Sequence, residues 1–330
     1  MRRVALLPVI GLLTILPGCY SSNLLEYEGL KPANIAISGS VKSLVVVSKC
    51  DLDSAYKFTA ILAGRLSDFK RDSIMMKQTV LGCSDALLES PRFSLFNPVV
   101  TRNLAGQYTN PSEKIPWTKV LEIAGDPPHD AVLSMEYGTI DDTIRSNPAS
   151  GWLNPCQFVV SVKTHWRLYR LSDFQTVEFN FADTVAYDID SPSEFLSSLN
   201  MGPDFIKSAM YDAGVATAKR LAPWWSTFRR YYFSIGPQGF ETAASFLTDG
   251  NWKQAAEILR PFTLSRAKFI ARNASFNMAL TCEMAGNFPA AYDWLTKAEK
   301  LGVHELYITE YRAQLSARKI ELDKLDNQMK

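Results

Sequence analysis

The feature that most constrains the fold is an alternating stretch in the middle of the sequence, between residues 160 and 181. Every second residue of its first half suits a protein core, and these residues are Val160, Val162, Thr164, Trp166 and Leu168. A polar turn near Ser172 follows, and the alternation resumes at Val177. Because successive side chains of a strand point to opposite faces, the pattern predicts an antiparallel β-hairpin with one buried and one hydrated face. A membrane-spanning hairpin alternates in the same way, but the charges on the polar face and the lack of aromatic girdles argue against it.

Strands and helices are interleaved around this hairpin. Leu44–Val47 is a continuous branched run, which predicts a strand buried on both faces. Further strands are expected over residues 92–96 and 131–135, and helices over about 72–88, 116–123 and 203–221. Proline, glycine and aromatic residues cluster between Pro223 and Gly239, which predicts a domain boundary. We therefore expect an α/β domain over residues 41–235, with a mixed sheet that contains the antiparallel hairpin.

The sequence from residue 236 to residue 330 has a helical pattern and repeats itself. Asp249-Gly250-Asn251-Trp252 has a counterpart in Ala285-Gly286-Asn287-Phe288, about 36 residues further on. Ala255 and Ala291 follow the two motifs at the same distance. Small residues let two antiparallel helices approach, the glycine turns the corner and the aromatic residue fills the seam, as in tetratricopeptide repeats. We expect an all-α, tetratricopeptide-like module.

Such modules usually present a concave groove to a peptide or a protein partner. By their position in the repeat, five residues are expected to line this groove: Asn273, Phe276, Asn277, Leu280 and Glu283. The alternative for each of them is a packing or solvated residue with no partner. Two repeats are fewer than the roughly three that an independent solenoid needs, so the module is expected to lean on the first domain.

The N-terminal residues have the form of a lipoprotein signal. Two arginines precede an apolar run from Val4 to Leu16, which is too short to span a bilayer and is typical of a cleaved secretory signal. Leu16-Pro17-Gly18-Cys19 resembles the lipobox of bacterial lipoproteins, in which the cysteine thiol takes a diacylglycerol before cleavage. We expect a signal peptide over residues 1–18, acyl chains such as palmitate on Cys19, and a tether over residues 19–40. The alternative is a plain secreted protein with Cys19 in a disulfide.

The residues after Cys19 bear on localisation. Tyr20, Ser21 and Ser22 supply neither an aspartate directly after the cysteine nor an acidic export run. By resemblance to known sorting rules, this favours the periplasmic face of the outer membrane over the cell surface. The near-neutral composition, with 35 Lys and Arg against 34 Asp and Glu, gives no electrostatic reason to expect nucleic acid as a partner.

Four cysteines remain in this expected oxidising compartment: Cys50, Cys83, Cys156 and Cys282. They allow three full pairings, and the sequence does not choose between them. Cys282 occupies an apolar helical position, which favours a small buried thiol. No pair has the spacing of a zinc site or a CxxC centre, so no metal or cofactor is expected.

Several segments together indicate a family. They are Leu44–Val47, Asp130-Ala131-Val132-Leu133, the hairpin, Leu221-Ala222-Pro223 with Arg230-Tyr231-Tyr232, and Gly286 with its neighbouring alanines. In these segments the chain resembles Bacteroidetes-type envelope lipoproteins of unknown function, and its first domain is distantly similar to the periplasmic domain of the curli-secretion lipoprotein CsgG and to the N-terminal domain of TolB. The resemblance implies a fold and a location, and no activity or catalytic residues.

Four hydroxyl residues also resemble the acidic-hydroxyl-apolar acceptor of Bacteroidetes O-glycosylation: Ser54, Ser73, Thr143 and Thr184. Ordinary helix caps and strand ends account for the same residues equally well, and Ser73 in particular is a candidate cap.

Catalytic patterns are sparse. Of three histidines, only His129 has an acidic neighbour, Asp130, and the sequence contains no G-x-S-x-G, Walker, H-E-x-x-H or dinucleotide motif. The sequence therefore predicts a non-catalytic outer-membrane lipoprotein that acts as a protein-interaction or assembly module of the envelope. Two alternatives remain: a periplasmic enzyme or ligand-binding protein with a cleft at His129, Asp130 and Asp142, or a CsgG-like oligomeric assembly subunit.

Overall fold

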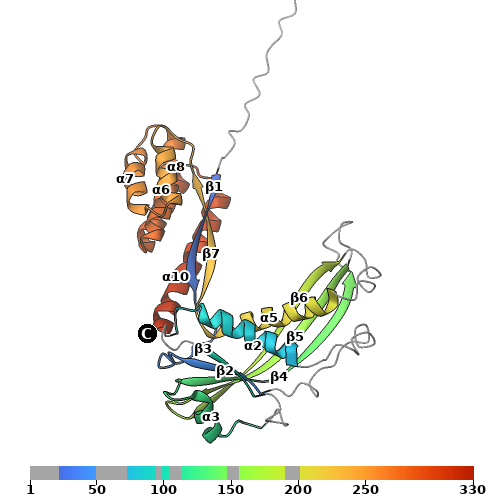
Figure 1. Cartoon of the computed structure of the whole chain (residues 1–330). Helices are drawn as coiled ribbons and strands as arrows, with labels where there is room; N and C mark the ends of the chain where they lie inside the picture. The colour runs from blue at the N-terminus through green and yellow to red at the C-terminus, as the bar shows by residue number, and fades with distance from the viewer. Residues whose placement is uncertain (1–21, 50–72, 94–98, 105–112, 147–155, 190–200) are drawn as a thin grey trace, which may run out of the picture. The chain divides into compact units, whose positions relative to one another are not determined.

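The computed structural model describes residues 22–49, 73–93, 99–104, 113–146, 156–189 and 201–330. The chain divides into two compact units (Figure 1). The sheet unit contains residues 29–226 and 320–330, and the helical unit contains residues 1–28 and 227–319. The prediction of a mixed α/β region followed by a C-terminal run of helices is confirmed.

The sheet unit is built on five strands in the order β3-β2-β4-β5-β6. Their bounds are β2 Leu44–Ser48, β3 Val99–Asn103, β4 Ala131–Ser146, β5 Cys156–Arg170 and β6 Gln175–Ile189. β2 runs parallel to both of its neighbours, and β4, β5 and β6 are antiparallel. β2 is buried along its whole length, as its branched run predicts. The predicted hairpin is confirmed as β5 and β6, with Trp166 opposite Phe179.

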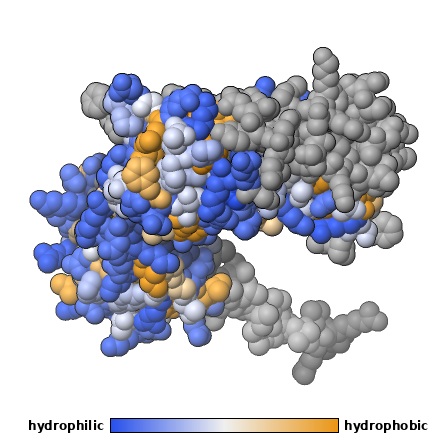
Figure 2. Space-filling view, turned by 90° about the horizontal axis from the view of Figure 1, so that it is seen from below, coloured by the Kyte–Doolittle hydropathy of each residue, from blue (hydrophilic) through white to orange (hydrophobic). Residues whose placement is uncertain are grey.

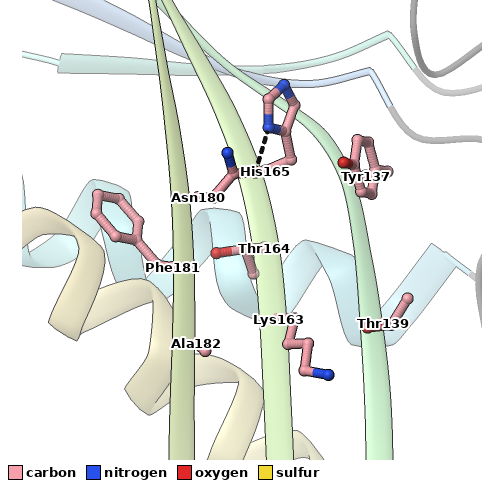
Figure 3. A pocket seen from close by; sticks show the side chains of 8 residues that line it. All are labelled: Tyr137, Thr139, Lys163, Thr164, His165, Asn180, Phe181 and Ala182. Carbon is pink, nitrogen blue, oxygen red and sulfur yellow. Dashed lines mark hydrogen bonds between the residues drawn. The ribbon is translucent and has the colours of Figure 1, made fainter.

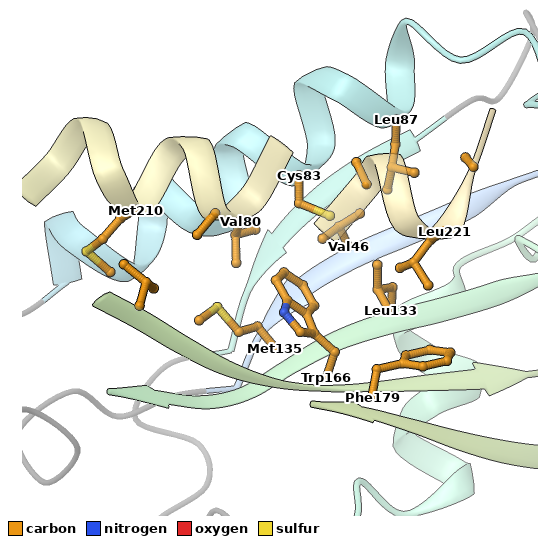
Figure 4. Packing of buried hydrophobic residues seen from close by; sticks show 14 of the residues in the cluster. Val46, Val80, Cys83, Leu87, Leu133, Met135, Trp166, Phe179, Met210 and Leu221 are labelled. Atoms are coloured by element: carbon orange, nitrogen blue, oxygen red, sulfur yellow. The ribbon is translucent and has the colours of Figure 1, made fainter. Parts of the chain in front are cut away.

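Helices cover both faces of this sheet. α2 (Ser73–Leu88) and α5 (Met201–Leu221) pack over one face, where Trp166 lies among aliphatic side chains from both layers (Figure 4). α3 (Trp117–Ala124) covers β2 and part of β4 and β5 on the other face. Since the apolar face of the hairpin is covered by helices of its own chain, the membrane-spanning alternative is wrong.

Two glycines allow α2 and α5 to approach closely. A Cβ on Gly82 would lie 2.2 Å from the carbonyl oxygen of Tyr211, and one on Gly214 would lie 2.0 Å from that of Thr79. Real Cβ atoms do not come so near to a backbone oxygen. The side-chain-free surface of each helix therefore fits against the backbone of the other.

The helical unit contains α6 (Phe240–Thr248), α7 (Trp252–Phe262), α8 (Lys268–Met284), α9 (Phe288–Lys300) and the first part of α10 (Glu305–Met329). Gly250 and Gly286 both adopt φ +75°, a left-handed conformation that suits glycine, and end the first helix of each pair. Ala255 and Ala291 are fully buried in the following helices. The two repeated motifs thus form two helix–turn–helix pairs, α6–α7 and α8–α9.

Two expectations about the chain were wrong. Ser22–Lys31 is not a tether but strand β1, and it pairs with β7 (Trp224–Phe233), which occupies the expected boundary cluster. A strand at residues 92–96 is also wrong for its described part, because Arg92 and Phe93 lie in a turn and the strand is β3. Burial alternates along much of each strand. In β1, Leu25 is buried between the exposed Leu24 and Glu26. In β7, Phe228 is buried between the exposed Thr227 and Arg229, so each strand has one face to bury.

No helix within the described ranges has both the length and the apolar composition needed to cross a bilayer. The coloured residues in Figure 2 are mainly hydrophilic, and the hydrophobic residues among them form small groups. Three of the cysteines, Cys83, Cys156 and Cys282, are free thiols. Cys50 and the lipidation site Cys19 lie outside the described residues.

Candidate functional site

The five predicted groove residues all lie on α8 and are all buried. Strand β7 covers the middle of the row: the Asn277 Oδ1 accepts the backbone N–H of Phe233 at 2.9 Å, and the Asn277 Nδ2 donates to the Phe233 carbonyl at 2.7 Å. Asn273 donates to the carbonyl of Ile235, which follows β7. These amides bind an extended backbone, but it belongs to the same chain.

Glu283 is the centre of a buried polar cluster at the other end of the row. Its carboxylate accepts Arg230 Nη2 of β7 at 2.6 Å, the Tyr311 hydroxyl of α10 at 2.8 Å and the Tyr27 hydroxyl of β1 at 3.4 Å. Burial and the Glu283 charge raise the pKa of Tyr311 well above its usual value. Burial alone would lower the pKa of Arg230, but the hydrogen bond and the charge of Glu283 outweigh burial, so the pKa of Arg230 is raised. The cluster therefore keeps Arg230 charged and the tyrosines neutral.

Phe276, between Asn273 and Glu283 in the row, also contacts the segments that cover α8. Its ring contacts Phe233 of β7 with a centroid separation of 5.1 Å and Tyr311 of α10 with one of 5.3 Å. Leu280 is fully buried. The expectation that the five residues form an open groove for a separate partner is therefore not met in this structure, since the chain's own β7 and α10 fill the place.

The three residues of the alternative site, His129, Asp130 and Asp142, are engaged within the fold. One carboxylate oxygen of Asp130 accepts the backbone N–H groups of Lys42 and Ser43 and the Ser43 hydroxyl, so it fixes the start of β2. His129 and Asp142 are buried, and neither is among the residues that line the pocket on β4, β5 and β6. No group of three metal-ligating side chains occurs in the part of the chain that the structure describes.

A pocket of about 300 Å³ opens on β4, β5 and β6 (Figure 3). Eight residues line it: Tyr137, Thr139, Lys163, Thr164, His165, Asn180, Phe181 and Ala182. The ring of Tyr137 stacks on that of His165 at a centroid distance of 4.9 Å. The Nδ1 of His165 lies 2.7 Å from Asn180 Oδ1, and this hydrogen bond holds the imidazole against the sheet.

A line of charges runs from this pocket into the sheet unit. The Nε2 of His165 lies 3.9 Å from Glu178, which accepts Arg167 Nε at 2.9 Å. Arg167 also contacts the fully buried Glu136 at 3.0 Å, and Lys49 contacts the same carboxylate at 3.0 Å. The hydrogen bond from Arg167 lowers the pKa of Glu178, and burial together with Glu136 raises the pKa of Tyr169 to about 12. These ion pairs hold in place the side chains next to His165.

The prediction that the second face of the hairpin is fully hydrated was wrong for part of β5. His165, Arg167 and Tyr169 are buried, because α3 and paired charges of β2 and β4 cover that part of β5. Lys163, two residues along, is exposed, and none of the ion pairs found among the described residues includes it. The pocket therefore combines an exposed cation, a ring stack and an amide.

Sequence reasoning missed Tyr137 and Asn180. The predicted third strand ended at Met135, but β4 continues to Ser146 through a bulge at which Glu136 is the extra residue. The bulge directs Tyr137 to the same face as its partner His165. Of the glycosylation candidates, Thr143 and Thr184 are exposed on β4 and β6, whereas Ser54 and the Ser73 side chain lie outside the described residues.

Comparison with known proteins gives two matches to family models. Residues 41–233, more than half of the chain, match a family described as a domain of unknown function (DUF8603). Residues 241–317 match a second, described as a domain of unknown function (DUF6340). No curated protein sequence matches the chain significantly.

Solved structures give distant likenesses. A PelC dodecamer from Paraburkholderia phytofirmans is 14% identical, with 61% of this chain and 99% of that chain covered at a TM-score of 0.26. A putative neuraminyllactose-binding hemagglutinin homolog from Helicobacter pylori is 14% identical, covering 58% and 88% at a TM-score of 0.29. The hypothetical protein CT253 from Chlamydia trachomatis is 12% identical, covering 54% and 96% at a TM-score of 0.29. These scores are too low to transfer a site.

Proposed function

We propose that this chain, which belongs to the family described as a domain of unknown function (DUF8603), is a non-catalytic lipoprotein of the outer membrane that binds an envelope protein or peptide through the open face of its sheet. The observation that carries the proposal is the pocket beside Tyr137, Lys163 and His165, together with the filling of the helical groove by β7.

The chemistry of the pocket favours one protruding side chain of a protein partner. A volume of about 300 Å³ is at the lower end of the range for ligand pockets, and it suits a side chain better than a large cofactor. Lys163 supplies a positive charge, while the stacked Tyr137 and His165 offer a flat apolar surface. A partner that presents an acidic side chain next to an apolar one fits this arrangement.

A non-catalytic role is supported by how the candidate acid and base groups are engaged. The carboxylate of Asp130 is committed to three hydrogen bonds at the start of β2. His165 is held between Asn180 and Tyr137, and its nearest carboxylate, Glu178, is bound by Arg167. A general base needs a free acceptor within hydrogen-bond reach of a substrate, and these groups are paired with their own chain.

The helices are, in this proposal, tetratricopeptide-like repeats whose groove is used internally. The equivalent turns at Gly250 and Gly286 and the buried Ala255 and Ala291 support the repeat assignment. Asn277 and Glu283 contact β7 in the way such a groove would contact a bound peptide. The helical unit is thereby completed by β7, β1 and α10 rather than by a further repeat.

Two experiments test the proposal. Metabolic labelling with an alkyne fatty acid, followed by intact mass analysis, should show acyl chains on Cys19 and none in Cys19→Ser; an unmodified Cys19 would remove the lipoprotein assignment. Partners recovered from solubilised envelopes should depend on the sheet face, so that Lys163→Glu and Tyr137→Ser abolish recovery. The matched control is Lys253→Glu, at an exposed lysine of α7. Recovery that is lost with the control alone would refute recognition by the sheet.

A second candidate function is binding of a small anionic ligand, because the volume of the same pocket also admits a single sugar acid or amino acid. Titration of the purified chain with such acids by calorimetry distinguishes the two functions. Saturable binding that Lys163→Glu abolishes would favour the small ligand over a protein partner.

A further inference from the structure

The start of β1 is close to the proposed anchor along the chain. Only Tyr20 and Ser21 separate Cys19 from Ser22, where β1 begins. At 3.3 to 3.6 Å per extended residue, the three steps from Cys19 to Ser22 span at most about 11 Å. A lipidated Cys19 would therefore hold the first residue of an ordered strand near the lipid head groups.

Several elements of the helical unit end at this same place. The Ser22 hydroxyl lies 3.0 Å from the Tyr307 hydroxyl at the start of α10, and Asn23 is bonded to Ser234 at the end of β7. Arg272 near the start of α8 donates to the carbonyl of Gly302, between α9 and α10. We call this region the anchor end of the helical unit. It comprises residues 22–24, 234–235, 263–273 and 301–307.

Exposed hydrophobic side chains of the helical unit gather at the anchor end. Its described residues include five large hydrophobic side chains that are exposed, and all five belong to this end: Leu24, Ile235, Leu264, Phe269 and Leu306. Leu264 is 80% exposed and Leu306 is 65% exposed. The opposite end, at the turns around Gly250 and Gly286, has exposed polar and small residues, among them Asp249, Asn251, Ala285 and Asn287. The exposed hydrophobic side chains of the helical unit therefore lie at the end that is near Cys19 along the chain.

We propose that the anchor end is a lipid-contacting surface, on which Leu264, Phe269 and Leu306 enter the head-group region of the membrane that holds Cys19. The inference rests on the proposed lipidation. A hydrophobic side chain that costs free energy in water is stabilised at the bilayer interface, and the anchor supplies the proximity that so few side chains could not supply alone. Arg266 and Lys268, both exposed beside Leu264 and Phe269, lie where they can contact lipid phosphates.

The test uses the full lipidated chain in vesicles of phosphatidylethanolamine and phosphatidylglycerol. A fluorophore is attached at position 306 in Leu306→Cys, at position 264 in Leu264→Cys and, as the matched control at the opposite end, at position 285 in Ala285→Cys. Labelling of native thiols is measured on the unsubstituted chain and subtracted. Lipids with a spin label near the head group should remove most of the fluorescence at positions 306 and 264 and leave position 285 nearly unchanged. Circular dichroism checks that each variant is folded.

The outcomes separate this inference from the proposed function. Equal quenching at positions 306 and 285, on protein whose mass shows the acyl chains, would overturn the lipid contact and leave the lipoprotein assignment standing. An unmodified Cys19 would overturn both. Dimers in detergent that Leu306→Ser abolishes would assign the anchor end to a second copy of the chain, and this too would overturn the inference.

Discussion

The Glu283 cluster offers the sharpest test of how the helical unit is held together. The side chains of Glu283 and Arg230 are 2% and 4% exposed, and they lie on α8 and β7. Glu283→Gln keeps the size of the side chain and removes the charge, so Arg230 stays buried without its carboxylate. Breaking a buried pair in this way costs about 3–5 kcal/mol, a large part of the roughly 5–15 kcal/mol that stabilises a typical domain.

Native-state hydrogen exchange on the amides of α8 is the appropriate assay, because two units need not unfold in one step. A loss of about 3 kcal/mol corresponds to exchange that is roughly a hundredfold faster. The control is Glu299→Gln, which breaks the exposed pair with Arg312 and should leave exchange unchanged. The double variant Arg230→Met with Glu283→Leu should be less destabilised than Glu283→Gln, since an apolar pair leaves no buried charge. Unchanged exchange in Glu283→Gln would refute the idea that β7 is fixed by this cluster.

Three further predictions concern the two units. Gly214→Ala should destabilise the sheet unit by about 1–3 kcal/mol in urea unfolding, because the new Cβ meets the Thr79 carbonyl; an unchanged midpoint would contradict the close approach of α2 and α5. The hydrogen bond from Arg167 lowers the pKa of Glu178, so the contact stabilises the folded sheet unit above the ordinary pKa of 4.5 and less so as the pH falls below it. When melting temperatures are measured over a range of pH, Glu178→Gln should reduce the loss of stability below pH 4.5. An unchanged pH dependence in this variant would argue against the contact. Burial raises the pKa of the Cys83 thiol, so alkylation at pH 8 should modify Cys156 and Cys282 well before Cys83, whose early modification would contradict its burial.

Much of the sheet unit could be predicted because its signals are local. The branched run at Leu44–Val47 and the alternation of the hairpin specify strands by their own composition. The turns at Gly250 and Gly286 were predictable for the same reason, since a repeated glycine marks a repeated left-handed turn. In each case one short segment contains the whole pattern.

The rest depends on contacts between distant segments. β1 lies in a stretch whose composition reads as a tether, and only its pairing with β7, about 200 residues away, makes it a strand. The position of Asn277 in the repeat predicts a groove-lining residue, but it cannot indicate that the side chain binds the backbone of Phe233 in the same chain. The pocket was missed because it needs the bulge at Glu136, which turns Tyr137 onto His165. No single segment contains these signals.

The central claim is that partners meet the open face of the sheet and not the helices. Site-specific photocrosslinking in intact cells tests it most directly, with benzoylphenylalanine at position 163 in one strain and at position 253 in another. The account predicts a discrete crosslinked species at position 163, lost when Tyr137→Ser is added, and none at position 253. A crosslinked species at position 253 with none at position 163 would contradict it.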